Sequence, residues 1–184
     1  MAADLIQTIE SERLILPLLT ASRLERLLGG QVAAVEKEIG VRFPEWWMAE
    51  VGRHMEWRLK QIGENPESEP WLLRPIVLRD GISGPVVIGM INFHGPPDDA
   101  GFAEVGYELH PDHRGKGYAI EAVRALFDWA SREHGVHKFR ASISPGNERS
   151  ENLVRKLGMV RVGAQWDDPD GLELIWTLSG WPPA

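Results

Sequence analysis

A glycine-rich segment between a predicted strand and a predicted helix holds the residues best suited to bind an anion. It reads His113-Arg114-Gly115-Lys116-Gly117-Tyr118-Ala119. Gly115 and Gly117 lack a Cβ, so an anion can approach the main chain, while Arg114 and Lys116 supply positive charge. A helix N-terminus adds unpaired N–H groups and a dipole that favours phosphate. The sequence therefore predicts a pyrophosphate seat at residues 114–119.

The elements on either side of this segment follow from the hydrophobic pattern. Alternating apolar residues from Val105 to Leu109 indicate a strand, and Pro111 ends it because proline cannot donate a ladder hydrogen bond. Apolar residues at steps of three and four then indicate an amphipathic helix from about Ala119 to His134. The predicted order is strand, anion-binding loop, helix.

Two common phosphate-binding loops do not fit the spacing. A Walker A loop requires a glycine five positions before its Gly-Lys pair and a Ser or Thr after the lysine, but those positions hold His110 and Gly117. The dinucleotide fingerprint G-x-G-x-x-G is incomplete, because Ile120 stands where the third glycine is required. A nucleotide-bearing cofactor must therefore be recognised through another pattern.

The pattern Arg-x-x-Gly-x-Ala at Arg114, Gly117 and Ala119 resembles the acyl-CoA-binding motif of the GCN5-related N-acetyltransferases (GNAT). The resemblance extends to five other segments: Ser11–Leu16, Tyr107–Pro111, Glu121-Ala122, Asn147-x-x-Ser150-x-Asn152 and Lys156–Met159. Together they are similar to the branch of RimJ/RimL-like ribosomal-protein N-terminal acetyltransferases. The likeness spans about the whole chain and is strongest from roughly residue 101 to 160.

Length and composition limit the classes of protein to consider. A chain of 184 residues, 43% hydrophobic and 26% charged, is expected to form one folded domain, residues 1–184. The absence of cysteine excludes disulfides, thiolate metal sites and a cysteine acyl-enzyme intermediate. The formal charge of −7 argues against nucleic acid and suits a cationic amine, or only aids solubility. We expect a cytoplasmic protein without membrane contact, since no apolar run approaches ~20 residues.

The remaining elements define the fold class. Strands are predicted at 13–19, 71–78, 86–93, 138–142, 160–164 and 172–178, and helices after Thr20, from Pro44 and at 147–157. Residues 64–69 are predicted to form a polar loop, and the turns at 80–84 and 95–99 connect strands. Antiparallel strands followed by a strand–helix–strand crossover predict an α/β protein with a three-layer α-β-α sandwich and a mixed, mostly antiparallel sheet. The resemblance adds that the sheet splays apart at the cofactor, between the strands on either side of the main helix.

The resemblance implies acetyl-CoA as cosubstrate, no metal, and direct transfer of the acetyl group to an amine. By position, the main-chain N–H of Leu109 polarises the thioester carbonyl, where negative charge grows in the transition state. Ser150 protonates or hydrogen-bonds the leaving thiolate, or is only a first-turn polar residue that satisfies a backbone N–H. Asn147 caps the helix, contacts pantetheine, or does both, and Asn152 belongs to the same cofactor-binding set.

The attacking amine must lose its proton, and a carboxylate close to the splayed strand can accept it. Glu108 is the nearest candidate, although it fits a solvated or ion-paired strand residue equally well. Glu173, in the last strand, is the rival. His110 and His113 invite a zinc reading, but they straddle Pro111 and have no obvious third ligand, so we expect no metal.

The acceptor side is less defined by the residues. Trp46 and Trp47 could line an acceptor cavity or belong to the core. From the resemblance, the acceptor pocket is expected within residues 20–65 and the 95–100 turn. Four kinds of acceptor remain open: a protein N-terminus, an amino acid, a polyamine-like metabolite and an amine drug. A non-catalytic acyl-CoA sensor or interaction module on the same fold is the alternative function, and a homodimer is an option by family analogy only.

Overall fold

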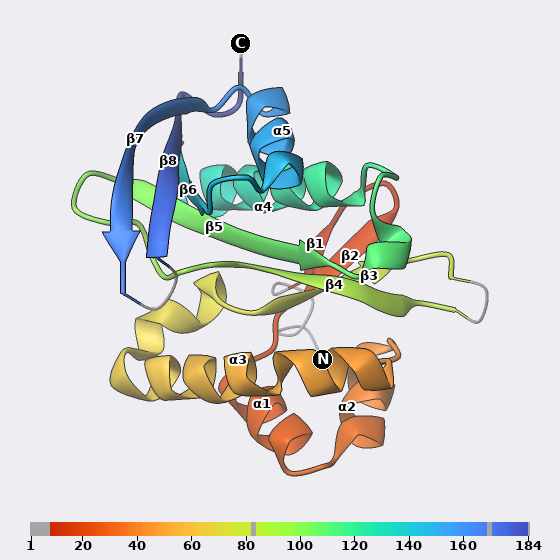
Figure 1. The fold of residues 1–184 in the computed structure, drawn as a ribbon. Coiled ribbons are helices and arrows are strands. Elements are labelled where there is room, and N and C mark those ends of the chain that lie inside the picture. The colour runs from red at the N-terminus through yellow and green to blue at the C-terminus, as the bar shows by residue number, and fades with distance from the viewer. Residues whose placement is uncertain (1–7, 82–83, 169–170, 184) are drawn as a thin grey trace.

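The computed structural model describes residues 8–81, 84–168 and 171–183, and in it one sheet lies between two layers of helices (Figure 1). The eight strands are β1 (Thr8–Glu10), β2 (Leu14–Pro17), β3 (Arg74–Leu78), β4 (Val86–Phe93), β5 (Phe102–Leu109), β6 (Lys138–Ile143), β7 (Val160–Asp167) and β8 (Gly171–Ser179). Their spatial order is β1-β2-β3-β4-β5-β6-β8-β7. Only the β5–β6 pair is parallel among these neighbours. The predicted mixed, mostly antiparallel sheet is confirmed.

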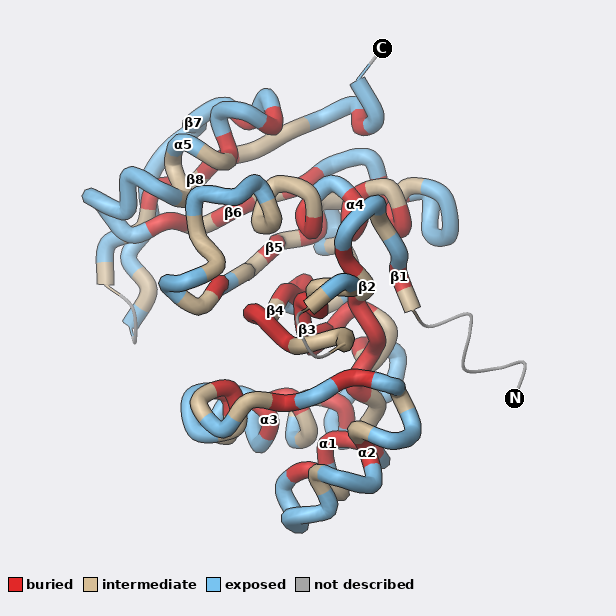
Figure 2. The backbone as a smooth tube through the Cα atoms, turned by 90° about the vertical axis from the view of Figure 1, so that its right-hand side faces the viewer, coloured by how far each residue is buried: buried red, intermediate tan, exposed pale blue. Residues whose placement is uncertain are grey.

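Helices cover both faces of the sheet. The layer below it in Figure 1 contains α1 (Ala21–Leu28), α2 (Val32–Ile39) and α3 (Glu45–Glu64). The layer above contains α4 (Tyr118–His134) and α5 (Glu148–Lys156). Each layer encloses its own apolar core against the sheet, and Figure 2 shows buried residues concentrated on the central strands and on the inward sides of the helices. This is the predicted three-layer sandwich.

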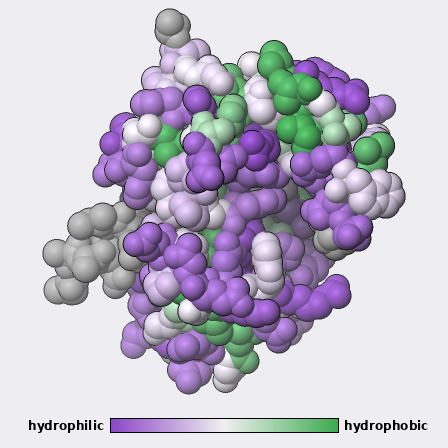
Figure 3. All heavy atoms as spheres, turned by 90° about the vertical axis from the view of Figure 1, so that its left-hand side faces the viewer, coloured by the Kyte–Doolittle hydropathy of each residue, from purple (hydrophilic) through white to green (hydrophobic). Residues whose placement is uncertain are grey.

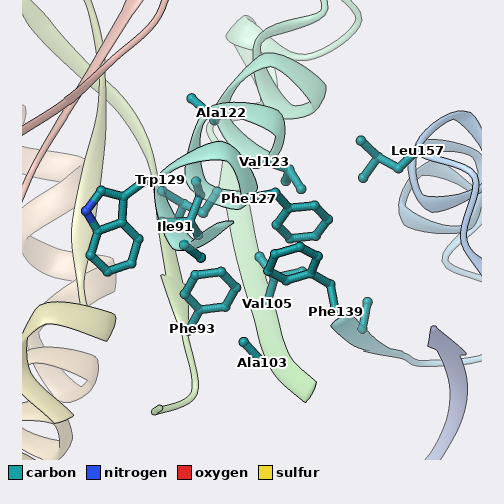
Figure 4. Close-up of a cluster of buried hydrophobic side chains, with 14 of the residues drawn as sticks. Ile91, Phe93, Ala103, Val105, Ala122, Val123, Phe127, Trp129, Phe139 and Leu157 are labelled. Carbon is teal, nitrogen blue, oxygen red and sulfur yellow. The ribbon is translucent and has the colours of Figure 1, made fainter. Parts of the chain in front are cut away.

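Three phenylalanine rings fix the main helix over the sheet. Phe127 of α4 stacks on Phe139 of β6 with ring centroids 3.7 Å apart and planes 4° apart, and Phe93 of β4 lies 5.9 Å from Phe139 (Figure 4). Beneath them Ala103 of β5 pairs with Phe139. Such stacked pairs add about 0.5–1.5 kcal/mol each beyond the burial of area. The stack therefore holds β4, β5, β6 and α4 together at the place where β5 and β6 still pair.

Beyond that place β5 and β6 separate. Their register runs from Phe102↔Lys138 to Glu104↔Arg140, while β5 continues to Leu109 and stays paired with β4 as far as Gly89↔Leu109. The last five residues of β5 therefore have no β6 register partner. The splay that the family resemblance implied is present, on the side of the sheet that leads to the glycine-rich loop.

Several local predictions need correction. The polar loop expected at 64–69 is instead the end of α3 and a 3-10 helix, η2 (Pro66–Trp71), which the Asn65 side chain caps by accepting from the Glu67 N–H. The strand expected from Trp71 starts only at Arg74, since Trp71 is buried in the last turn of η2. Pro44 is the N-cap residue of α3 and lies outside its first turn.

Strand lengths and turns also differ in places. The first predicted strand is shorter, Leu14–Pro17, and an additional strand, Thr8–Glu10, pairs with it. The strand predicted at 160–164 extends to Asp167 as one side of a hairpin with β8. In the turn predicted at 80–84, Ile82 and Ser83 lie outside the described residues. Hydrophilic side chains predominate on the face drawn in Figure 3, as the composition predicts for an outer surface.

Candidate active site

A cleft of about 600 Å³ opens where β5 and β6 separate. It is lined by residues of β5, of the glycine-rich loop with the start of α4, and of α5 with its cap: Tyr107, Glu108, Leu109, Arg114, Gly115, Gly117, Tyr118, Ala119, Ile120, Asn147, Arg149, Ser150, Asn152, Leu153 and Lys156. Every predicted site residue except Lys116 is among them. The Lys116 ammonium turns back instead and donates to the Asp112 carbonyl at 2.8 Å. The fold thus brings three separate sequence segments to one cavity.

The glycine-rich loop has the backbone geometry of an anion seat. Gly115 and Gly117 have φ angles of +75° and +82°, a region that side chains other than glycine rarely adopt. Gly117 is the N-cap residue of α4 and offers no side chain to cap it. The first turn of α4, Tyr118 to Ile120, borders the cleft. The helix N-terminus therefore faces the cleft, and no side-chain oxygen from its N-cap occupies the position that an anion would take.

Arg114 connects this loop to the end of β5. Its Nε donates to the Leu109 carbonyl at 2.9 Å, and the residue also borders the cleft. The short 3-10 helix η3 (Pro111–His113) makes the turn between the two. Arg114 thus fixes the distance between the last strand residue and the anion seat, in addition to its positive charge.

The backbone of β5 presents polar groups to the cleft. His94 N–H donates to the Glu104 carbonyl at 2.8 Å, and His110 N–H donates to the Ile88 carbonyl at 3.0 Å. Because antiparallel hydrogen-bonded pairs alternate, the even-numbered residues of this strand bond to β4. The N–H and C=O groups of Val105, Tyr107 and Leu109 therefore point toward β6, which has diverged. This register directs the Leu109 N–H into the cleft, as the predicted thioester contact requires.

The start of α5 supplies the far wall of the cleft. Asn147 is the N-cap, and its Oδ1 accepts from the Ser150 N–H at 3.3 Å. The capping interpretation of Asn147 is confirmed, while a contact with pantetheine stays a prediction. The Ser150 hydroxyl is not needed to cap the helix, since Asn147 has that role. Asn152 borders the cleft and accepts from Arg155 Nη1 at 3.3 Å.

Tyr107 is a cleft residue that sequence reasoning did not assign to the site. Its hydroxyl is buried and forms no hydrogen bond of normal geometry among the described residues, although the Ser150 side chain lies close enough to interact with it. Burial raises the pKa of Tyr107, and the neighbouring Ser150 side chain only partly opposes that shift. The hydroxyl therefore stays protonated at neutral pH and remains available as a donor. The alternating pattern of the strand gave no signal for this role, because a tyrosine at an inward position fits an ordinary core residue.

Glu108 lies at the boundary between two cavities. It is exposed and borders the cleft, and it also borders a much smaller cavity between α3 and β4. The residues around the smaller cavity are Trp46, Trp47, Glu50, Val51, Gly89, Met90, Glu108 and His110. Glu173, the rival base, lies on β8 opposite Gln165 and borders neither cavity. Of the two carboxylates considered from the sequence, only Glu108 is placed at the splayed strand.

The two adjacent tryptophans have different surroundings. Trp47 is fully buried, and its Nε1 donates to the Gly89 carbonyl at 3.0 Å, so it anchors α3 to β4 as a core residue. Trp46 is half-buried, and its ring lies 4.4 Å from that of His110. The expected acceptor region within residues 20–65 thus contributes Trp46, Glu50 and Val51 from α3, whereas the 95–100 turn borders neither cavity.

The described part of the chain shows neither a metal-binding cluster nor a membrane-spanning helix. No group of three or more His, Cys, Asp or Glu side chains there could hold a metal ion. His110 and His113 do approach each other, with ring centroids 6.2 Å apart. Within residues 8–81, 84–168 and 171–183, no helix is both long enough and apolar enough to cross a membrane.

Comparisons with known proteins show which family this chain is related to. The chain is 32% identical over 104 residues to the uncharacterized N-acetyltransferase YnaD of Bacillus subtilis, covering 56% of each chain. It is 31% identical over 78 residues to the [ribosomal protein uS5]-alanine N-acetyltransferase of Escherichia coli, covering 42% of this chain and 40% of the relative. The matched part is thus about half the length of these curated relatives.

Solved structures and a family model agree with these relatives. The structure of RimL, a ribosomal L7/L12 alpha-N-protein acetyltransferase in complex with coenzyme A, has the same fold, with a TM-score of 0.63 and 15% identity over 94% of this chain and 97% of that one. The family model of the acetyltransferase (GNAT) domain matches residues 13–160, most of the chain. The matched segment contains the splayed strand, the glycine-rich loop and α5. The chain therefore belongs to the GNAT acetyltransferase family.

Proposed function

We propose that this chain transfers the acetyl group of acetyl-CoA directly to a primary amine. The observation that carries the proposal is the position of Glu108, which borders both the large cleft and the smaller cavity beside α3. Acetyl-CoA occupies the cleft, with its pyrophosphate at residues 114–119 and its thioester beside Leu109. The amine approaches from the α3 side and meets the thioester at Glu108.

The residues around this point divide the chemical steps among them. The neutral amine attacks the carbonyl carbon, and its proton passes to Glu108 directly or through a water molecule. Negative charge that grows on the carbonyl oxygen is stabilised by the Leu109 N–H, at up to a few kcal/mol for one aimed donor. The C–S bond then breaks, and the leaving sulfur takes a proton or a hydrogen bond from a hydroxyl. We assign this step to Ser150 and Tyr107, whose side chains lie beside each other in the cleft.

The acceptor side favours an amine that arrives with a positive charge. Two carboxylates, Glu50 and Glu108, border the small cavity, and the half-buried Trp46 ring offers a face for a cation. The net charge of −7 adds a field in the same direction. A protein amine, such as the ribosomal-protein alanine in the name of the E. coli relative, and a small-molecule amine both satisfy this chemistry. The alternative, a non-catalytic acyl-CoA sensor, would bind acetyl-CoA without releasing CoA.

The proposal is tested with Glu108→Gln and with Glu173→Gln as the matched control, another strand glutamate that lies outside both cavities. Acetyl-CoA affinity is measured by calorimetry, and thiol release is measured against pH with a panel of amines and N-terminal peptides. Glu108→Gln should lower turnover by about 10² or more, as expected for loss of a general base, with unchanged acetyl-CoA affinity. Glu173→Gln should leave both quantities unchanged.

Three other outcomes would count against parts of this proposal. An unchanged pH–rate profile in Glu108→Gln would remove Glu108 from the base role. A larger loss in Glu173→Gln would transfer that role to β8. Tight acetyl-CoA binding without thiol release on any acceptor would favour the sensor.

A further inference from the structure

The turn between β1 and β2 is attached to the anion seat by a dense set of polar contacts. Arg13 forms a salt bridge with Glu121 of α4, with Nη2 and Oε2 2.6 Å apart and Nε and Oε2 2.7 Å apart. The Arg13 N–H and the Ser11 hydroxyl both donate to Glu121 Oε1 at 2.8 Å. Arg13 Nη1 also donates to the Lys116 carbonyl at 3.1 Å. One arginine thus connects the first turn of α4 to the glycine-rich loop.

The contact with the Lys116 carbonyl determines where the next N–H points. The C=O of Lys116 and the N–H of Gly117 belong to one planar, trans peptide unit, so they point in opposite directions. Arg13 draws the carbonyl toward the β1–β2 turn, and the Gly117 N–H is therefore directed away from Arg13. Gly117 borders the cleft, so this N–H is available to a phosphate oxygen. At Gly117 φ is +82°, and a Cβ there would lie only 3.3 Å from Arg13 Nη2.

The contacts to Glu121 remove an electrostatic obstacle. Glu121 lies in the first turn of α4, beside the place where a pyrophosphate would bind, and its negative charge would repel that group. Burial favours a higher pKa for Glu121, but the hydrogen bonds from Arg13 and Ser11 outweigh burial and lower the pKa overall. The carboxylate is thus ionised and fully engaged by Arg13 and Ser11. The positive charge of Arg13 therefore offsets the negative charge of Glu121 next to the anion seat.

We propose that Arg13 is a positioning residue of the anion seat. Arg13 holds the Lys116–Gly117 peptide with its N–H toward the cleft, and it neutralises the negative charge of Glu121. The Arg13 guanidinium does this while also lying 4.6 Å from the centre of the Tyr118 ring, at the first residue of α4. Loop orientation therefore depends on a residue more than a hundred positions away in the chain. This inference rests on the proposed function, because it assumes that the seat receives the pyrophosphate of acetyl-CoA.

The test compares Arg13→Gln and Arg13→Lys with Arg79→Gln. Arg79 is a matched control: its side chain also anchors the β1–β2 turn, with Nη2 3.2 Å from Glu10 Oε2 and 3.1 Å from the Ser11 carbonyl, and these partners lie outside the glycine-rich loop. Affinity for CoA is measured by calorimetry at two salt concentrations, and folding of each variant by thermal unfolding. The Gly117 amide signal in a ¹⁵N correlation spectrum reports the peptide orientation without any ligand.

Arg13→Gln should weaken CoA binding about tenfold, as expected for loss of one hydrogen bond to a charged group, and should move the Gly117 amide signal. Arg13→Lys should not restore affinity, since an ammonium cannot reproduce the fork that reaches both Glu121 and the Lys116 carbonyl. Arg79→Gln should bind CoA like wild type. With all variants folded, this pattern supports positioning.

Other results overturn the inference in distinguishable ways. Full rescue by Arg13→Lys would reduce the role of Arg13 to charge alone. An equal loss in Arg79→Gln would assign the effect to anchoring of the β1–β2 turn. An unmoved Gly117 signal would contradict the orientation of the peptide. Failure of wild type to bind CoA would instead contradict the proposed function itself, and this inference with it.

Discussion

Removing the hydroxyl of Tyr107 should make the free protein more stable and its complex with acetyl-CoA weaker. The hydroxyl is buried beside Ser150 and forms no hydrogen bond of normal geometry within the described part of the chain, and a buried unsatisfied donor costs about 1–3 kcal/mol. Tyr107→Phe removes that cost and keeps the ring, which packs against the core under α4. We expect a gain of about 1 kcal/mol in the free energy of unfolding, or about 2–4 °C in Tm for a chain of this size.

In the complex, we expect the same hydroxyl to donate a hydrogen bond to acetyl-CoA. It lies beside Ser150 in the cleft, and burial keeps it protonated through the neutral range because its pKa is raised. A hydrogen bond from it to bound acetyl-CoA would contribute about 0.5–1.5 kcal/mol. Tyr107→Phe should therefore bind acetyl-CoA about 2- to 10-fold more weakly, and saturating ligand should raise its Tm by less than it raises that of wild type.

The assay is urea unfolding of both proteins, with and without acetyl-CoA, together with calorimetric titration. The control is Tyr118→Phe, the other tyrosine of the chain, because its hydroxyl is not among the buried unsatisfied ones. Tyr118→Phe should not stabilise the free protein. A free Tyr107→Phe protein destabilised by more than about 1 kcal/mol would refute the reasoning, since the hydroxyl would then have a partner in the folded state. Equal affinity for acetyl-CoA would show that the hydroxyl does not contact the ligand.

Two further predictions concern the splay and pH. In Gly89→Ala the Cβ of the new alanine would lie 2.2 Å from the Glu108 carbonyl oxygen, so β4 and β5 must shift. We expect this variant to be less stable by about 1–3 kcal/mol and to turn over about 10²-fold more slowly. Unfolding and kinetics that both match wild type would contradict this prediction. Glu121 has a lowered pKa in the folded state, so its carboxylate stabilises the fold above its usual pKa, and this contribution is lost as pH falls through the folded pKa. Glu121→Gln should flatten the loss of stability as pH falls below the usual glutamate pKa of 4.5, and an unchanged acid limb would argue against the Arg13 contacts.

Local patterns predicted the loop and the helix that we propose to bind the cofactor. Two glycines at positive φ and a helix directly after them are signals carried within seven residues, from His113 to Ala119, and the structure keeps them together at the cleft. Helix spacing and strand alternation likewise predicted α4 and β5, which are set by one buried face each. Lys116 is the exception, since its side chain reaches a carbonyl in the preceding turn.

Features that depend on contacts between distant residues were not predictable. The Arg13–Glu121 salt bridge joins residues 108 positions apart, and no spacing rule indicates such a pair. The buried hydroxyl of Tyr107 lies beside Ser150, 43 positions later in the chain, and an alternating strand pattern does not indicate such a neighbour. The segment Pro66–Trp71 reads as a loop because it is polar and contains proline, yet Asn65 caps it as a 3-10 helix. Sequence therefore predicts the glycine-rich loop and its helix, while the contacts of this loop with distant residues depend on the fold.

The central claim is that acetyl-CoA and an amine meet at Glu108 and react there. The most direct test incubates wild type and Glu108→Gln with acetyl-CoA and a panel of amines and N-terminal peptides, and measures released CoA and acetylated product together by mass spectrometry. We predict that wild type forms equal amounts of free CoA and one class of acetylated amine, and that Glu108→Gln forms about a hundredth as much or less at the same acetyl-CoA affinity. Binding of acetyl-CoA by wild type without any acetylated amine, or full activity in Glu108→Gln, would contradict it.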